Sequence, residues 1–282
     1  MDGIYLIKKP TGITSRDLVD GLGKILGTKK VGHTGTLDPF ADGLMILTVG
    51  KATKAGLFLE ALDKRYEATL KLGTKTDTGD LTGTVIATSP LIDLYDQYVN
   101  DTLESMLGPQ LQMPPMYSAI KQDGVPLYQL AREGKTVTRD PRPIHLYEMK
   151  LISLTKDTIR FSVRCSKGTY VRTLAEDIAA KFGMVGHLTS LTRIAIGQYK
   201  LAAAKTIDAI TPQDRLTVYQ ALSFMDQVTI KEPSQIKAIM DGKPFTITHP
   251  KNRLLLIDGQ QQVLAIYDRS EGTIYKPVRG LF

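Results

Sequence analysis

The sequence predicts an α+β fold with a small all-β domain at its C-terminal end. Residues 65–72 alternate between apolar and other side chains, which is typical of a strand with one buried face. Residues 14–26 carry apolar side chains at helical spacing, so this segment is expected to bury one face of a helix. From Val228 onwards, several short strands follow one another closely, which favours a small β-barrel. We therefore expect two domains, 1–226 and 227–282.

The elements of the larger domain are short apolar runs separated by turn residues. After a strand at 4–7, Thr14 and Asp17 mark the start of a helix that ends at Gly27. A further helix is expected to begin near Tyr170 with Thr169 as its cap. The remaining expected elements are strands at 44–49, 65–72, 144–154 and 158–165, helices at 52–62 and 97–107, and helix and linker at 206–224.

The last part of the chain is expected to hold one helix at 233–240 and strands at 253–257, 262–267 and 273–278. Asp258 and Gly259 lie between the first two of these strands. An Asp-Gly pair between apolar runs is a strong hairpin signal, because both residues tolerate the positive φ that tight hairpin turns require. The pattern therefore indicates an antiparallel pair joined at this point.

The composition is that of an ordinary globular protein, with 42% hydrophobic and 23% charged residues. The formal net charge of +7 favours a polyanionic partner without specifying one. Residues 61–113 are acidic on balance. We expect this segment to face away from nucleic acid except near Tyr66, and a solvated acidic surface with no partner is the alternative.

The single cysteine, Cys165, excludes an intramolecular disulfide and fits a reducing compartment. We expect it to be a buried small residue rather than a nucleophile. No apolar run is long enough to span a bilayer. The N-terminus has no basic segment before its first strand, so no signal peptide is expected. These features predict a cytoplasmic protein without a membrane partner.

The segment 32–43, Gly-His-Thr-Gly-Thr-Leu-Asp-Pro-Phe-Ala-Asp-Gly, is unusual in its density of glycine and acidic residues. Pro39 fixes its own φ and favours an extended conformation at Asp38, so the Asp38 carboxylate is expected to point in a fixed direction. Such an aspartate suits a nucleophile or general base, and an Asp-Pro turn also suits plain architecture. A phosphate-binding loop is excluded at Gly50-Lys51, because Ala52 stands where Ser or Thr is required.

This segment resembles motif II of the pseudouridine synthases, in the TruB type that acts on the T arm of tRNA. The resemblance extends from residue 4 to about residue 200, and Asp38 matches the catalytic aspartate of the family. It implies a pseudouridine synthase fold, with a central mixed, mostly antiparallel sheet flanked by helices. It also implies that the C-terminal β-barrel is a compact PUA-like domain that binds RNA.

The resemblance implies further site residues outside this segment. Tyr66 matches a tyrosine that stacks on the target base and takes part in proton transfer, although a tyrosine on such a strand face is more often core than catalytic. Arg172 matches the active-site arginine, and its partner is either the Asp38 carboxylate or Glu176 at i+4. The other residues that match positions at the family's catalytic loop or target-base pocket are His33, Lys9, Tyr170 and Leu191, and each is expected to contact the substrate RNA.

Residues 108–142 are rich in proline and glycine and mix aromatic with basic side chains, which suits a mobile segment that folds against a partner. They resemble an insertion that clamps the RNA stem-loop, so Tyr117, Lys121, Tyr128 and Arg132 are expected to contact RNA. An ordinary surface loop and helix is the alternative. The hydroxyl- and acid-rich loop 73–80 is expected to be structural.

Together these features predict an isomerase that converts the T-loop uridine of tRNA, position 55 by family analogy, to pseudouridine. The resemblance implies base flipping with Asp38 as nucleophile, at C6 or at C1′, and a strongly salt-dependent affinity for RNA. No cofactor, metal, guide RNA or protein partner is expected, and the protein should be a monomer. The alternatives are the guide-dependent catalytic subunit of box H/ACA particles and a catalytically silent RNA chaperone.

Overall fold

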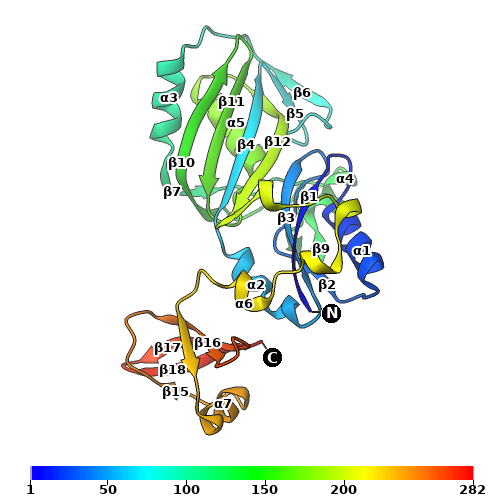
Figure 1. The fold of residues 1–282 in the computed structure, drawn as a ribbon. Coiled ribbons are helices and arrows are strands. Elements are labelled where there is room, and N and C mark those ends of the chain that lie inside the picture. Colours follow the sequence, from blue (N-terminus) through cyan, green and yellow to red (C-terminus); the bar gives the residue numbers. More distant parts are fainter. Residues whose placement is uncertain (1, 282) are drawn as a thin grey trace.

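A mixed sheet is the framework of the larger domain (Figure 1). In the computed structural model, which describes residues 2–281, this sheet has nine strands in the order β1-β3-β12-β4-β11-β10-β7, with β2 paired to β3 and β13 to β12. Its strands are β1 (Gly3–Lys9), β2 (Val31–His33), β3 (Asp42–Val49), β4 (Lys64–Leu72), β7 (Gly108–Gln112), β10 (Arg142–Leu154), β11 (Thr158–Cys165), β12 (Gly186–Ile196) and β13 (Tyr199–Lys200).

Within these described strands, β3 and β12 run parallel and the other neighbours run antiparallel. This confirms the mixed, mostly antiparallel sheet. The parallel contact joins Asp42 and Gly43 to Thr192 and Arg193, at the place where segment 32–43 enters β3. The sheet therefore fixes the end of that segment against β12.

The periodicity of β4 is confirmed, because alternate residues from Lys64 to Leu72 are buried. The inward side chains pack with those of β11 against α5 (Val171–Lys181), and α3 (Asp96–Ser105) packs against β10. Cys165 is part of this core, as expected, and burial raises the pKa of its thiol to about 11.

The first helix, α1 (Ser15–Leu26), begins and ends as predicted. Thr14 and Asp17 form a reciprocal capping box, and Gly27 ends the helix in the left-handed conformation with φ of 64°. The helix expected at 52–62 is instead a 3₁₀ segment, η1 (Gly50–Ala55), followed by the short α2 (Gly56–Glu60). The remaining helical segments of this domain are α4 (Leu127–Arg132), η2 (Leu201–Ala203), η3 (Ile207–Ala209), η4 (Pro212–Asp214) and α6 (Val218–Ala221).

Residues 108–142 begin inside the main sheet, since β7 pairs with β10. They continue as a two-stranded hairpin, β8 (Lys121–Gln122) with β9 (Val125–Pro126), and then as α4. The loop 73–80 is extended by a second small hairpin, β5 (Thr74–Thr76) with β6 (Val85–Thr88).

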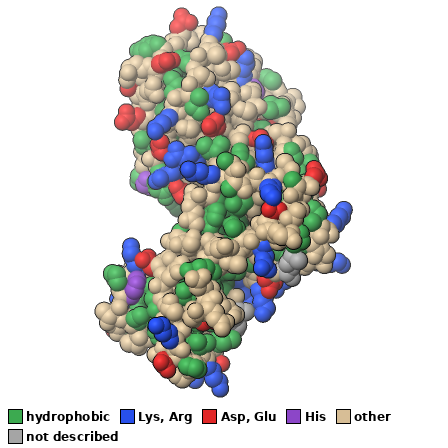
Figure 2. All heavy atoms as spheres, viewed as in Figure 1, with side chains coloured by type: hydrophobic (Ala, Val, Ile, Leu, Met, Phe, Trp, Pro, Cys, Tyr) green, Lys and Arg blue, Asp and Glu red, His purple; other side chains and the backbone are tan. Residues whose placement is uncertain are grey.

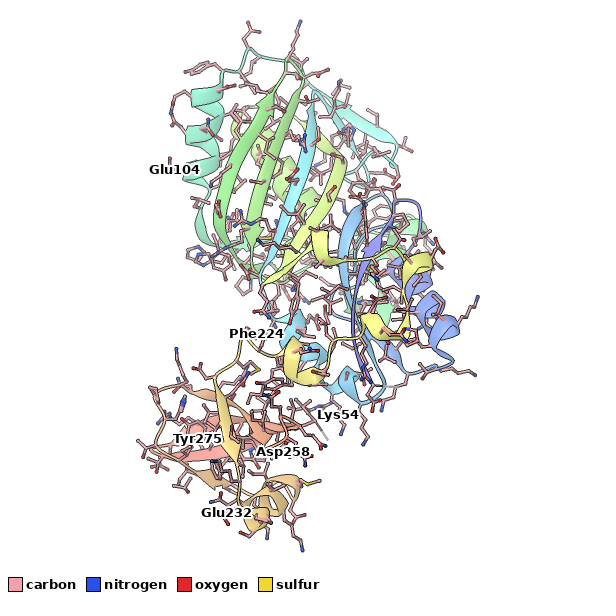
Figure 3. All side chains as sticks on the ribbon, in the orientation of Figure 1. Lys54, Glu104, Phe224, Glu232, Asp258 and Tyr275 are labelled. Atoms are coloured by element: carbon pink, nitrogen blue, oxygen red, sulfur yellow. The ribbon has the colours of Figure 1, made fainter. Side chains whose placement is uncertain are left out.

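The C-terminal domain is a curled five-stranded half-barrel in the order β14-β16-β17-β18-β15, consistent with a PUA-like domain. Asp258 ends β16, at the position labelled in Figure 3, and its carboxylate accepts hydrogen bonds from the backbone N–H groups of Gln260 and Gln262. The predicted antiparallel pair is therefore confirmed. Its turn is longer than the Asp-Gly pair, however, and the positive φ, of 61°, belongs to Gln261 and not to Gly259. The elements are β14 (Gln227–Ile230), α7 (Pro233–Met240), β15 (Phe245–Thr246), β16 (Arg253–Asp258), β17 (Val263–Glu271) and β18 (Ile274–Gly280).

The two domains share one hydrophobic cluster. Side chains from β1, β3, α2 and the end of α6 pack in it against side chains from β16 and β17. Its fully buried members include Ile4, Leu44, Leu59, Leu222, Leu255 and Ile266. The chain passes near Phe224 from the larger domain into β14 beside this cluster (Figure 3).

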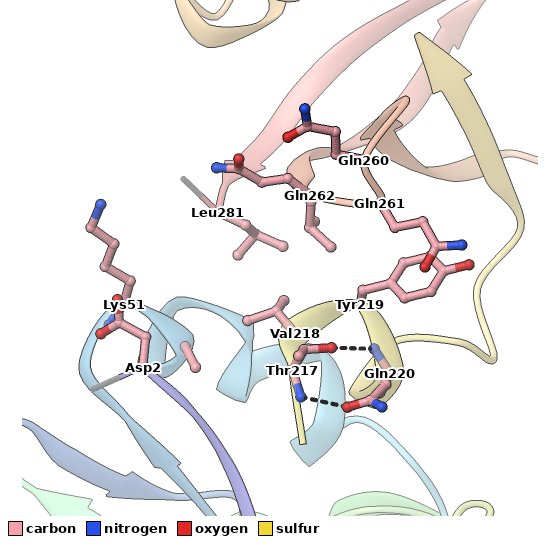
Figure 4. A pocket seen from close by; sticks show the side chains of 12 residues that line it. Asp2, Lys51, Thr217, Val218, Tyr219, Gln220, Gln260, Gln261, Gln262 and Leu281 are labelled. Atoms are coloured by element: carbon pink, nitrogen blue, oxygen red, sulfur yellow. Dashed lines mark hydrogen bonds between the residues drawn. The ribbon is translucent and has the colours of Figure 1, made fainter. Parts of the chain in front are cut away.

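A pocket of about 540 Å³ opens at the same junction. Gln260, Gln261 and Gln262 face it from the β16–β17 hairpin, opposite Thr217 and Gln220, which bond to each other across the first turn of α6 (Figure 4). Figure 2 shows Lys and Arg side chains gathered at the lower end of the larger domain, above the waist between the domains. None of the helices in residues 2–281 is both long and apolar enough to cross a bilayer.

Candidate active site

Segment 32–43 is held on one side by the turn between β1 and α1 and by the first residue of α1. The N–H of Gly12 donates to the carbonyl of Pro39 at 2.7 Å. The Ser15 hydroxyl both donates to the Leu37 carbonyl and accepts from the Leu37 N–H, at 3.0 and 2.9 Å. These bonds fix the backbone on both sides of Asp38, as the rigid-loop prediction requires.

Arg193 of β12 holds the same segment from the other side. Its guanidinium donates to the carbonyls of Gly35 and Thr36 at 3.2 and 3.3 Å, and to that of Leu44 at 2.7 Å. Gly43 has a φ of 116°, and a Cβ there would lie 2.4 Å from the Arg193 carbonyl oxygen. A glycine is therefore required where the segment meets β12.

Asp38 and Arg172 form an ion pair, with Arg172 Nε 2.8 Å from Asp38 Oδ2. Of the two partners considered for Arg172, the structure has Asp38, because Glu176 instead pairs with Lys75 at 3.3 Å. The Arg172 side chain is 4% exposed and that of Asp38 is 33% exposed. The carboxylate is thus oriented by a buried cation while one side of it stays accessible.

The other two nitrogens of Arg172 reach two further segments. Nη1 donates to the Thr78 carbonyl and Nη2 to the Tyr117 carbonyl, each at 2.7 Å. Each of the three guanidinium nitrogens of Arg172 therefore donates a hydrogen bond. Arg172 joins segment 32–43, the loop 73–80 and residues 108–142 at one point.

The loop 73–80, expected to be structural only, reaches the ion pair through Asp80. Its buried carboxylate lies 3.9 Å from Arg172 Nε. Asp80 Oδ1 accepts hydrogen bonds from the Thr78 hydroxyl and the Thr82 N–H, both at 2.9 Å. Asp80 thus adds a second negative charge beside Arg172 and fixes the turn whose Thr78 carbonyl Arg172 binds.

The helix that carries Arg172 begins next to Tyr170, as predicted, but Thr169 is not its cap. The Thr169 hydroxyl donates to the Ser166 carbonyl instead. The side-chain amide of Gln112 binds the backbone of Tyr170 on both sides, accepting from its N–H at 2.8 Å and donating to its carbonyl at 3.1 Å. A residue of β7 therefore fixes the backbone at the start of α5.

A cavity of about 240 Å³, the smaller cavity below, lies beside Asp38. Tyr66, Tyr170 and Leu191 line it together with Asp38 and Arg172, so the structure brings these five predicted residues together. Tyr66 is 8% exposed, and burial raises the pKa of its phenol. The phenol is therefore neutral at physiological pH.

A second cavity of about 600 Å³, the larger cavity, meets the first at Asp38. His33, Tyr117, Tyr128 and Arg132 line it, so four more predicted residues face one space. The Arg132 guanidinium lies over the Tyr128 ring at 5.6 Å. His33 is an exposed residue, but desolvation by the surrounding atoms, with a smaller contribution from the positive charge of Arg193, lowers the pKa of its ring. Its ring is therefore neutral at pH 7.

Two predicted contacts lie elsewhere. Lys9 is fully buried and donates to the carbonyls of Pro10 and Ile13, each at 2.8 Å, and of Pro39 at 3.4 Å. Its ammonium binds the Pro39 carbonyl of segment 32–43 and is not exposed, so Lys9 cannot contact RNA. This corrects the expected contact. Lys121 lies on β8, exposed and outside both cavities.

Three residues around the site were not found from the sequence: Lys64, Asp80 and Arg193. Lys64 and Arg193 had a detectable signal, since each is a charged residue on the inward face of a strand. Lys64 precedes Tyr66 by two positions, and Arg193 follows Leu191 by two. Asp80 had none, because its loop has no periodicity. Among residues 2–281, no three His, Cys, Asp or Glu side chains come together as a metal site would require.

The fold matches solved structures over nearly the whole chain. A crystal structure of a Cbf5-Nop10-Gar1 complex matches with a TM-score of 0.75 at 20% identity, over 99% of this chain and 85% of that chain. The structure of an H/ACA RNP bound to a substrate RNA containing 2′-deoxyuridine matches with a TM-score of 0.73 at 18% identity, over the same shares. These TM-scores establish the pseudouridine synthase fold, and at such low identity they establish the fold alone.

The sequence places the chain more narrowly. Residues 23–171 match the family model of the TruB family pseudouridylate synthase N-terminal domain. Proteins called tRNA pseudouridine synthase B are 41% identical in Syntrophotalea carbinolica, over 94% of this chain and 88% of that protein, and 40% identical in Hydrogenovibrio crunogenus, over 99% and 93%. The one from Opitutus terrae is 47% identical over 74% of this chain and 87% of that protein. The chain belongs to the TruB family and is an isomerase of the pseudouridylate synthase class.

Proposed function

We propose that this protein isomerises uridine to pseudouridine in the T loop of tRNA, at position 55, without a guide RNA. The observation that carries the proposal is the Asp38–Arg172 pair, which stands where the two cavities meet. One cavity is small and has aromatic side chains in its walls, and the other has more than twice the volume. The relatives called tRNA pseudouridine synthase B support tRNA as the substrate.

The smaller cavity would receive the flipped uracil. A base must leave its stack before an enzyme can act on it, and the pocket then reads the ring by stacking and hydrogen bonds. Tyr66, Tyr170 and Leu191 supply flat and apolar walls next to Asp38. The larger cavity would hold the RNA from which the base departs, with His33 filling the vacated space.

Asp38 would act as the nucleophile, at C6 of the ring or at C1′ of the ribose. Arg172 aims the carboxylate, since a charge-assisted bond at 2.8 Å fixes its direction. Tyr66 would stack on the uracil and lie beside C5, where a proton leaves after the new C5–C1′ bond forms. In this scheme the protein acts as a monomer in the cytoplasm, with no cofactor or protein partner.

The test is a tRNA transcript that carries no modifications. After incubation with the purified protein and no other RNA, pseudouridine is mapped chemically, and a transcript with cytidine in place of the T-loop uridine is the control. Product at that uridine alone supports the proposal. Product that requires a guide RNA would favour the box H/ACA type, and tight binding without product would favour an RNA chaperone.

Asp80→Asn is expected to lower the single-turnover rate about 10- to 100-fold. Without the Asp80 charge, Arg172 should shift slightly relative to Asp38, and a small displacement of catalytic groups has effects of this size. The asparagine keeps the bonds from Thr78 and Thr82 but removes the second negative charge beside Arg172. Asp77→Asn is the matched control, since within residues 2–281 the Asp77 carboxylate accepts a single hydrogen bond, from the Thr84 N–H at 2.8 Å. Equal rates for the two variants would exclude a role for Asp80 in the reaction.

A further inference from the structure

Two buried cations line the smaller cavity in addition to Arg172. Lys64 is 6% exposed and Arg193 is 1% exposed. Neither forms an ion pair with any residue in 2–281, whereas Arg172 pairs with Asp38 and lies near Asp80. Buried charges without an ion-pair partner are costly, so two of them beside a catalytic pocket require an explanation.

Their hydrogen bonds go to backbone carbonyls. Lys64 Nζ donates to the carbonyls of Glu60 and Leu62, at the end of α2. The guanidinium of Arg193 donates to three carbonyls, two in segment 32–43 and one in β3. Carbonyl dipoles satisfy N–H donors but leave the net charge in place. An ammonium has three N–H donors, so Lys64 keeps one for a ligand.

The excess charge fits a species that is anionic only during the reaction. If Asp38 attacks C1′, the C1′–N1 bond breaks and its electron pair passes to N1, so that the uracil leaves as an anion. If Asp38 adds to C6, the electron pair of the C5–C6 double bond passes to C5 and O4, and the ring again becomes anionic. In both routes one negative charge moves from Asp38 to the base.

We propose that Lys64 is a further catalytic residue of this reaction: its ammonium, supported by the charge of Arg193, binds a uracil oxygen and stabilises the ring while it is an anion. The inference rests on the proposed function. A neutral uridine gains little from two buried positive charges, whereas the anion gains much, and only such differential interactions accelerate a reaction. When C5 then bonds to C1′, the bond between Asp38 and carbon breaks, in the C6 route together with the C1′–N1 bond, and the negative charge returns to the Asp38 carboxylate. The C5 proton is then lost and N1 is protonated, which leaves a neutral pseudouridine ring.

The competing explanation is that Lys64 only caps α2. The groups that face its ammonium are Glu60 and Asp63 from the α2–β4 connection, Cys165 from β11 and Arg193 from β12. Burial, with Arg193 next, lowers the pKa of Lys64 to about 8. A catalytic ammonium therefore predicts a loss of kcat/KM as the pH rises through about 8, which a cap alone does not predict.

The experiment compares Lys64→Met and Lys64→Arg with wild type on the tRNA transcript. We measure single-turnover rate, tRNA Kd and the pH profile of kcat/KM. Lys64→Met should lower the rate about 100-fold, the typical effect of removing one preorganised donor, with Kd within about threefold of wild type. Lys64→Arg should retain most of the rate, and its alkaline limb should move to higher pH, because a guanidinium does not titrate there.

Lys71→Met is the matched control, because Lys71 lies on the outer face of the same strand and pairs with Asp157. It should match wild type. A wild-type profile flat through pH 8 to 9, or a Lys64→Met rate within threefold of wild type, would refute the inference. If Lys64→Met does not fold, the wild-type and Lys64→Arg profiles decide. Absence of product from wild type would instead refute the proposed function.

Discussion

Asp38→Asn is expected to abolish pseudouridine formation, with a fall in single-turnover rate of about 10⁴-fold or more, the size seen when a covalent nucleophile is removed. An amide has the shape of the carboxylate and can still accept the bond from Arg172 Nε, so the loop should keep its conformation. It has no negative charge to give to carbon. The loss should therefore lie in the chemical step.

The measurement is pseudouridine released from a stoichiometric enzyme–tRNA mixture, together with tRNA Kd. Asp42→Asn is the matched control, because Asp42 is the other acid of the segment and its carboxylate accepts a bond from the Thr192 hydroxyl at 2.5 Å. An asparagine preserves that bond, so Asp42→Asn should stay within about threefold of wild type. If Asp38→Asn retained full turnover, Asp38 could not be the nucleophile.

Arg172→Lys is the second large effect, with an expected loss of about 10²- to 10³-fold in rate at unchanged charge. A lysine ammonium is a point charge on a flexible stem and cannot bind Asp38, Thr78 and Tyr117 in the three directions of the guanidinium fork. Asp38 would then be poorly aimed. The position of residues 108–142 should also loosen, because the Tyr117 carbonyl loses its donor.

Single-turnover rate tests the first effect, and limited proteolysis within 108–142 tests the second. Arg164→Lys serves as the control, because this arginine lies at the surface and pairs with Asp63 at 3.2 Å. Surface ion pairs of this kind contribute little to the stability of the fold. A rate for Arg172→Lys equal to that of Arg164→Lys would mean that charge alone, without the fork geometry, supports Asp38.

Local patterns were sufficient for much of the fold. The alternation of residues 65–72, the capping box at Thr14 and the hairpin signal at Asp258 each depend on neighbouring residues, and each is confirmed. The strand Gly108–Gln112 was missed because a glycine and a proline in its first two positions read as turn chemistry. Its pairing with β10, an interaction distant in sequence, makes it a strand.

The site was predictable only through resemblance. Asp38 and Arg172 are separated by 134 residues, and no spacing rule connects them. Taken alone, Asp38 was slightly better suited to a turn than to catalysis. Lys9 shows the opposite limit, since resemblance placed it at the catalytic loop but could not show that its ammonium is enclosed by carbonyls. Burial of a charged group depends on the whole fold.

The hydrophobic cluster shared by the two domains bears on how binding energy would be used. A domain joined by a free tether adds affinity through its effective concentration, and its orientation must be ordered at each encounter. Here Leu255 and Ile266 of the half-barrel are locked against Leu44 and Leu222 of the larger domain. Any tRNA contact made by the half-barrel is thus oriented before the RNA arrives. The entropy of aligning the two surfaces is lost during folding and does not reduce the affinity.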